Sequence, residues 1–200
     1  MLRRISIAVL SAGLMASGAA AADPTTRDPV KVPAGTFTLD PKHASLVVKV
    51  PHMGFSHYTL RFNKLEGSFT YDPANWQATK VSITVDPKSI DTEDGIFNKT
   101  VAGYFEPDKY PTIQFTSTTM TSDAEGKGTL TGDLTLHGVT KPVTLDVTFN
   151  GYGPGLPLMA SRMGFSGAGK INRTDFGVKA ARPFAGDTVT LSFEVEFVKK

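Results

Sequence analysis

The chain has 200 residues, with 21 Lys and Arg against 19 Asp and Glu, and it contains no cysteine. The absence of cysteine excludes disulfides, thiolate metal sites and thiol nucleophiles. No run of basic residues indicates binding to nucleic acid, so this class of partner is not expected.

The first 22 residues predict a secretory signal peptide. Arg3 and Arg4 precede an apolar stretch from Ile5 to Ala16, and Ala20–Ala22 suits a small-residue cleavage site. We expect cleavage after Ala22 and a periplasmic protein. Without the two arginines the basic count falls from 21 to 19, which equals the acidic count of 19 and gives a formal charge of zero.

The rest of the chain is expected to contain a flexible arm and one folded domain. Residues 23–35 are rich in Pro, Thr and Asp, as exposed termini often are. Residues 36–200 have a length that suits a single domain. We therefore place the domain boundary near residue 36.

Period-two alternation of apolar and polar residues dominates this domain and predicts strands with one buried face. The alternation occurs at 37–39, 45–50, 65–71, 80–85, 112–116, 129–136, 143–149, 163–171 and 189–197. Short connections rich in turn-forming residues favour antiparallel neighbours. The pattern therefore predicts eight or nine strands, arranged either as a sandwich or as a barrel, which would have no exposed edges.

Two segments depart from this pattern. Between Asp91 and Pro107, apolar residues fall at helical spacing, namely Phe97, Val101, Tyr104 and Phe105. We expect a short helix that is capped by Asp91 or Thr92 and covers one open end of the sheet. Residues 151–160 are expected to form a loop, either at an entrance or as a plain hairpin connection.

No catalytic or metal-binding pattern stands out. His52 and His57 are five residues apart across a turn, but no acidic residue lies at ligand spacing beside them. Ser166 lies in a near match to G-x-S-x-G, but within a predicted strand rather than at a strand-to-helix turn. The acidic residues near 91–94 suit a helix start better than a calcium loop. We expect no catalytic residue, no metal and no required cofactor.

The inward face of the predicted strands is the most informative feature, because it is apolar and aromatic. An eight-stranded barrel is about the smallest that can hold a ligand inside. Strand parity predicts an apolar cavity lined by Val48, Phe69, Ile83, Phe115, Leu134, Leu136, Val147, Phe165, Phe193 and Val195. His52, His57 and Arg61 are candidates for contacts with a polar head group at the mouth.

Glycines share the inward parity at 67, 128, 132, 167 and 169. In strands, glycine marks either a bend or a close approach of another group. In a barrel, small inward residues can also leave volume for a ligand. The sequence leaves these readings equally open.

Several motifs resemble the YceI-like family of bacterial periplasmic lipid-binding proteins. Leu130–Val143 reads LTGDLTLHGVTKPV, which is the most specific match. Phe37–Asp40 with Ser45–His52, Tyr110–Ser117 (YPTIQFTS) and Asn172–Gly177 (NRTDFG) match further motifs. The resemblance runs from about Thr36 to Val198.

This resemblance implies a lipocalin-like antiparallel β-barrel of about eight strands with a short helix capping one end. It also implies a long-chain isoprenoid ligand, such as a polyprenyl lipid or an isoprenoid quinone, often in a homodimer. One departure is the helix segment 97–101, which lacks the family's basic–acidic pair followed by His-Leu. No role of those charged groups is carried over.

The sequence therefore predicts a periplasmic binding or carrier protein for such a lipid, with transient membrane contact during exchange. Two alternatives remain. One is an enzyme that acts on an apolar lipid in the same pocket. The other is a stress-response protein whose lipid is only structural.

Overall fold

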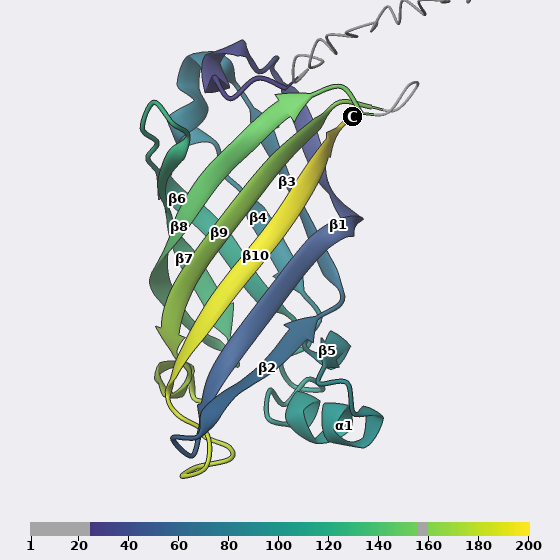
Figure 1. The fold of residues 1–200 in the computed structure, drawn as a ribbon, viewed down its shortest axis with the longest axis vertical. Helices are drawn as coiled ribbons and strands as arrows, with labels where there is room; N and C mark the ends of the chain where they lie inside the picture. The colour runs from purple at the N-terminus through teal and green to yellow at the C-terminus, as the bar shows by residue number, and fades with distance from the viewer. Residues whose placement is uncertain (1–24, 156–159) are drawn as a thin grey trace, which may run out of the picture.

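The computed structural model describes residues 25–155 and 160–200. The predicted signal peptide, residues 1–22, lies outside the described residues, as do residues 156–159 of the predicted loop. Within these ranges the strands are β1 (Gly35–His52), β2 (Ser56–Phe62), β3 (Leu65–Tyr71), β4 (Ser82–Val85), β5 (Ile90–Asp91), β6 (Ile113–Met120), β7 (Lys127–Leu136), β8 (Val139–Gly153), β9 (Arg162–Asn172) and β10 (Thr188–Lys199). They form a tall barrel (Figure 1).

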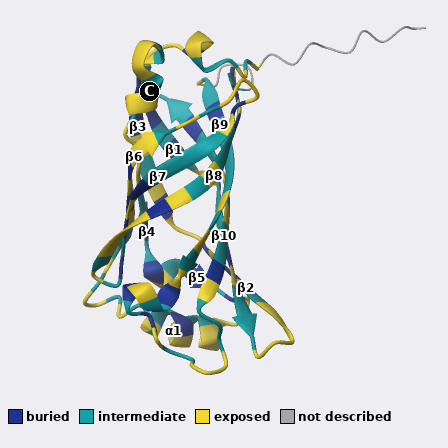
Figure 2. Cartoon of the chain, turned by 90° about the vertical axis from the view of Figure 1, so that its left-hand side faces the viewer, coloured by how far each residue is buried: buried dark blue, intermediate teal, exposed yellow. Residues whose placement is uncertain are grey.

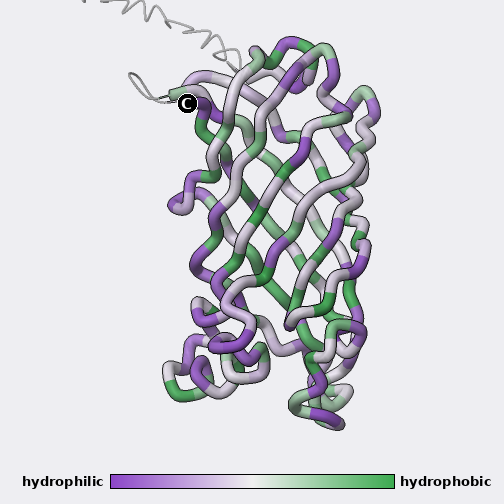
Figure 3. The backbone as a smooth tube through the Cα atoms, turned by 180° about the vertical axis from the view of Figure 1, so that it is seen from behind, coloured by the Kyte–Doolittle hydropathy of each residue, from purple (hydrophilic) through white to green (hydrophobic). Residues whose placement is uncertain are grey.

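Eight of these strands close into a ring, which confirms the predicted barrel. The ring runs β1-β3-β4-β6-β7-β8-β9-β10 and closes where β10 pairs with β1, and every neighbouring pair is antiparallel. Apolar and polar residues alternate along the strands, as the sequence predicts (Figure 3). Exposed residues gather on the connections at both ends and on the helix (Figure 2).

Strand β1 pairs with different neighbours along its length. Its register with β10 shifts between Leu39 and Ala44. Before this irregularity β1 pairs with β3, and after it β1 pairs with β2 over Leu46–His52. The two short strands predicted at 37–39 and 45–50 are therefore one strand of 18 residues.

Strands β2 and β5 are absent from the strands that the sequence predicts. The signal for β2 was present, because Tyr58, Leu60 and Phe62 point inward and alternate with polar residues. Of the residues of β2, the sequence singles out only His57 and Arg61, as candidates for the mouth. Strand β5 has only two residues and pairs with the end of β2, so it is too short to show a period.

The two-residue turn His137-Gly138 joins β7 to β8, as the LTGDLTLHGVTKPV motif suggests. Both residues have positive φ, 52° at His137 and 76° at Gly138. This combination gives the turn whose twist matches two antiparallel strands. His137 is held there by its ring contacts with Tyr110 and a 3.0 Å contact from Nε2 to Glu106 Oε1.

The predicted helix exists as α1 (Gly95–Gly103), but its predicted cap was wrong. Asp94 caps the helix and accepts from the backbone N–H groups of Ile96 and Phe97 at 2.9 and 3.1 Å. Asp91 belongs to β5 instead. Helical spacing locates a helix within a few residues, whereas several adjacent Asp and Thr residues can each supply a cap.

Part of the segment 23–35, which the sequence predicts to be a flexible arm, packs against the barrel. Residues 29–31 form the short 3-10 helix η1 (Pro29–Lys31), which is followed by Val32 with only 1% of its surface exposed. Tyr71 Oη donates a 2.8 Å hydrogen bond to the Pro29 carbonyl. The apolar end of the barrel that is at the top of Figure 1 thus gives this segment a surface on which to fold.

Three further 3-10 helices complete the order of elements in the described residues: η2 (Pro73–Ala78), η3 (Pro87–Ser89) and η4 (Arg173–Phe176). The 3-10 helix η2 lies with η1 at the upper end, whereas α1 lies at the lower end beside the β1–β2 hairpin (Figure 1). Here "upper" and "lower" refer to this view. Aromatic rings pack inside the barrel, with Phe69 stacked on Phe37 at 5.3 Å and against Phe197 at 4.8 Å.

Candidate functional site

The barrel encloses a cavity of about 720 Å³. This volume lies in the range of small-molecule sites, roughly 300–1,000 Å³. All ten residues that strand parity assigned to a cavity lie in its wall: Val48, Phe69, Ile83, Phe115, Leu134, Leu136, Val147, Phe165, Phe193 and Val195. Their contact with a lipid stays a prediction.

The hollow interior shows in the exposure of inward side chains. Leu145, Val147, Leu191, Phe193 and Val195 point into the barrel, yet each is only half-buried. Their uncovered surface therefore faces the cavity. In a filled interior, inward side chains would be closely packed, since protein cores leave few voids.

The inward glycines are sites of close approach. A Cβ atom on Gly167 would come within 3.0 Å of the Phe193 ring, and one on Gly169 would come as close to Leu145. At Gly132 the Phe115 ring and neighbouring backbone occupy the same space. Large side chains of neighbouring strands thus occupy the space that a side chain at each of these glycines would need.

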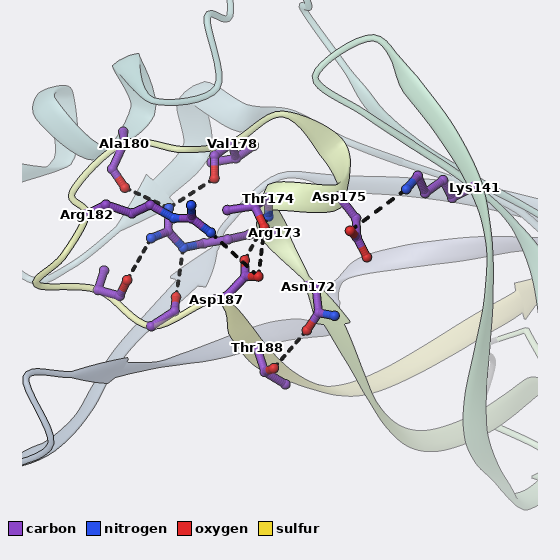
Figure 4. Close-up of polar contacts among 12 residues, drawn as sticks. Lys141, Asn172, Arg173, Thr174, Asp175, Val178, Ala180, Arg182, Asp187 and Thr188 are labelled. Carbon is purple, nitrogen blue, oxygen red and sulfur yellow. Dashed lines mark hydrogen bonds and ion pairs between the residues drawn. The ribbon is translucent and has the colours of Figure 1, made fainter.

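Arg173 is the buried cation of the cavity wall, and sequence analysis did not single it out. It is 8% exposed. Its Nη1 donates to the carbonyl oxygens of Val178 and Ala180 at 3.0 and 2.6 Å, its Nη2 to Ala185 at 2.8 Å, and its Nε to Gly186 at 2.8 Å (Figure 4). These four bonds hold the loop between η4 and β10 in place.

Burial lowers the pKa of the Arg173 guanidinium, and the negative charge of Asp187 opposes this effect. Asp187 itself accepts from the Thr174 backbone N–H at 3.0 Å and from its hydroxyl at 2.7 Å, and these bonds lower the pKa of Asp187. The NRTDFG motif therefore has a structural explanation. Arg173 anchors the loop, Phe176 is 2% exposed in the core, and the motif ends the barrel strand.

The three candidate head-group residues do not lie together in the structure. His52 lies in the cavity wall near the lower end. His57 and Arg61 lie on β2 with the opposite parity to its inward residues, and both are exposed outside the described cavity wall. The missed strand explains this difference, because consecutive residues of a strand face opposite sides.

Apart from Arg173 and His52, the polar side chains of the wall are hydroxyl groups and the Trp76 indole. Among the described residues that line the cavity, none is a carboxylate. No group of three or more His, Asp or Glu residues within 25–155 and 160–200 is arranged to hold a metal ion. In the same ranges no helix combines the length and apolarity needed to cross a bilayer.

The departure from the family pattern at 97–101 has a local role. Asn98 Oδ1 accepts from the Thr92 backbone N–H at 2.6 Å and from the Thr92 hydroxyl at 2.7 Å. Asn98 Nδ2 donates to Asp91 at 3.3 Å. Asn98 therefore ties the middle of α1 to the end of β5.

Comparison with known sequences identifies close relatives over most of the chain. A UPF0312 protein of Vibrio cholerae is 37% identical over 191 residues, which cover 94% of this chain and 98% of the relative. A UPF0312 protein of Pseudomonas putida is 37% identical over 161 residues, which cover 80% and 83% of the two chains.

Solved structures share the barrel. The crystal structure of Burkholderia cenocepacia BcnA has 25% identity and a TM-score of 0.69, and the match covers 79% of this chain and 98% of that one. A polyisoprenoid-binding domain from Saccharophagus degradans has 17% identity and a TM-score of 0.59 over 82% and 98% of the chains.

The family model of the YceI-like domain matches residues 37–197. The match spans the barrel from the first residues of β1 almost to the end of β10. The chain therefore belongs to the YceI-like domain family.

Proposed function

We propose that this protein binds a long-chain isoprenoid lipid, either a polyprenyl lipid or an isoprenoid quinone, in the barrel cavity and carries it through the periplasm. The observation that carries the proposal is the cavity of about 720 Å³ with half-buried apolar side chains in its wall. An apolar wall without carboxylates favours an apolar ligand and binding rather than acid–base catalysis.

The energetics favour a long chain. Removal of one methylene group from water contributes roughly 0.8 kcal/mol. A lipid tail of about twenty carbons would gain on the order of 15 kcal/mol before the cost of ordering is subtracted. The Saccharophagus degradans domain with the same fold is described as polyisoprenoid-binding, which makes isoprenoids the first lipids to test.

The experiment is mass spectrometry of organic extracts from protein purified from its native cells. We expect about one long-chain isoprenoid lipid per barrel. The purified protein, stripped of lipid, is then titrated with a fluorescent polyprenol analogue. Extracts without lipid, together with no binding of the analogue, would refute the proposal.

A lipid-exchange assay distinguishes a carrier from a protein whose lipid is only structural. A carrier loaded with labelled lipid releases it to acceptor vesicles, whereas a protein with a structural lipid retains it. Sedimentation of the same preparation tests the homodimer that the family resemblance implies, and a single monomeric species would exclude it.

A further inference from the structure

Exposed apolar side chains gather at the lower end of the barrel. Six large hydrophobic residues in the described part of the chain are exposed, and five of them lie on the segments at this end. We call these five the apolar rim: Met53, Phe55, Ile96, Phe97 and Phe184. Phe55 and Ile96 are 84% and 83% exposed. Apolar surface that clusters in this way marks an interaction site.

Two contacts join the three segments that carry the rim. The Met53 backbone N–H donates to the Phe184 carbonyl oxygen at 3.0 Å, so the β1–β2 hairpin contacts the loop before β10. The Tyr58 ring packs edge-on against Phe97 at 5.6 Å, so β2 contacts α1. The three segments that carry the rim therefore lie together at the lower end of the barrel (Figure 1).

The rim is continuous with the cavity. Met53, Phe97 and Phe184 belong to the cavity wall and are also 52%, 37% and 55% exposed. The apolar lining thus reaches the outer surface at this end. A lipid that leaves the cavity here would pass along apolar side chains.

The charges beside the rim have both signs. At α1, Lys99 is exposed near Glu93 and Asp94, and on the loop before β10 Lys179 and Arg182 are exposed near Asp187. A surface that binds anionic headgroups carries a cluster of basic residues instead. The rim is therefore suited to insertion of apolar side chains between neutral lipids, as in interfacial binding.

We propose that the apolar rim inserts into the surface of a phospholipid bilayer and places the cavity mouth against the acyl chains. This inference rests on the proposed function, since only a lipid-binding barrel needs its mouth at a membrane. The bilayer supplies apolar cover for residues on three separate segments, and it is both the source and the destination of the lipid.

The test uses flotation of the full-length mature protein with phosphatidylcholine vesicles. The variant carries Phe55→Ser and Ile96→Ser, two exposed residues outside the cavity wall. We expect its partition coefficient to fall at least about tenfold, because two apolar insertions are lost. Raising the salt from roughly 0.1 to 0.5 M should change wild-type binding less than twofold, because salt screens charge interactions and insertion of apolar side chains does not depend on them.

The matched control is Val30→Ser. Val30 is 60% exposed on the upper segment, away from the rim, and this variant should bind vesicles like the wild type. Equal binding by the rim variant, loss of wild-type binding at high salt, or no wild-type binding would overturn the inference. A dimer that dissociates on rim substitution, without vesicle binding, would assign the rim to self-association and also overturn it.

Solution binding of the fluorescent polyprenol separates the two proposals. The rim variant should bind this probe as tightly as the wild type, because both substituted residues lie outside the cavity wall. A wild type that binds the probe but not the vesicles refutes only the membrane inference. A wild type that binds vesicles but not the probe refutes only the proposed function.

Discussion

Gly167 on β9 lies directly opposite Phe193 on β10, and the Phe193 ring occupies the space that a side chain on Gly167 would need. A Cβ atom there would come closer than 3.0 Å to three ring atoms. Phe193 is thereby held against the barrel wall. From this position the ring lines the cavity.

Substitution of Gly167 by Ala should therefore destabilise the fold. We expect the free energy of unfolding to fall by about 1–3 kcal/mol, the usual cost of overpacking, as measured by urea denaturation. Gly164→Ala on the same strand is the control, because its nearest neighbour would lie at an ordinary 3.8 Å. If both variants unfold at the wild-type urea concentration, close packing at Gly167 is not important for stability.

Arg173→Lys should loosen the loop before β10. A lysine has three donors on one nitrogen and cannot reproduce the four bonds that the planar guanidinium makes. We expect a loss of about 2–3 kcal/mol in the free energy of unfolding and faster proteolysis between Val178 and Gly186.

Arg182→Lys provides the control for this loop. Arg182 is exposed, and its guanidinium lies 3.8 Å from Asp187. Its replacement should change stability by less than about 0.5 kcal/mol. A similar loss in both variants would show that the loop responds to any change of arginine and not to the four buried bonds.

Asp40 should make stability depend on pH in the acid range. Its hydrogen bond from Arg162, 2.7 Å long, lowers the pKa of Asp40 from 3.8 to about 2, against the opposing effect of burial. A folded-state pKa below the unfolded value adds stability above pH 3.8, and this stability disappears as pH falls toward 2. The contribution is about 1–2 kcal/mol, given partial contact with solvent.

Urea denaturation of the Asp40→Asn variant tests this prediction between about pH 5 and pH 2. The variant should lose less stability over this range than the wild type. Arg162→Gln removes the hydrogen bond between Arg162 and Asp40 by changing its donor. This variant should likewise lose less unfolding free energy than the wild type as the pH falls. Parallel curves for all three proteins would contradict the role assigned to this pair.

Val147→Trp should reduce lipid binding without unfolding the protein. Val147 is half-buried with its free surface toward the cavity, so a larger side chain can enter empty space. We expect the fluorescent polyprenol to bind at least about tenfold more weakly as its contact area is displaced. Val147→Ala is the control, and it should bind within about threefold of the wild type. Normal binding by the Trp variant would place the ligand elsewhere.

The sequence predicts the faces of strands better than their partners. Alternation alone placed residues such as Val48 and Leu134 on the inner face, since the period of two fixes which side is buried. It does not reveal that β1 exchanges β3 for β2 at an irregularity near Asp40, because pairing depends on residues that are distant in the sequence. For the same reason His57 and Arg61 were placed at the mouth, although they face outward on β2.

Features that depend on tertiary contacts were also beyond the sequence. The buried role of Arg173 rests on carbonyl groups of a loop that the arginine itself orders. Whether an inward glycine marks a bend, a close approach or empty volume depends on its neighbours in space, as the Phe193 ring beside Gly167 shows. The exposed residues Phe55 and Ile96 look like ordinary apolar residues in the sequence, and only the fold brings them to one end.

The exchange of partners by β1 gives the barrel two walls of different construction. Around the upper ring, each strand is held to the next by backbone hydrogen bonds, so any widening would break a ladder. Below the irregularity the sheet ends at β5, and α1 follows it where another strand would otherwise continue. The described elements η3 and α1 come between β4 and β6 in the chain, and side-chain contacts such as Phe62 with Phe105 at 5.8 Å join neighbours there. A change of width at this end would therefore break no strand ladder.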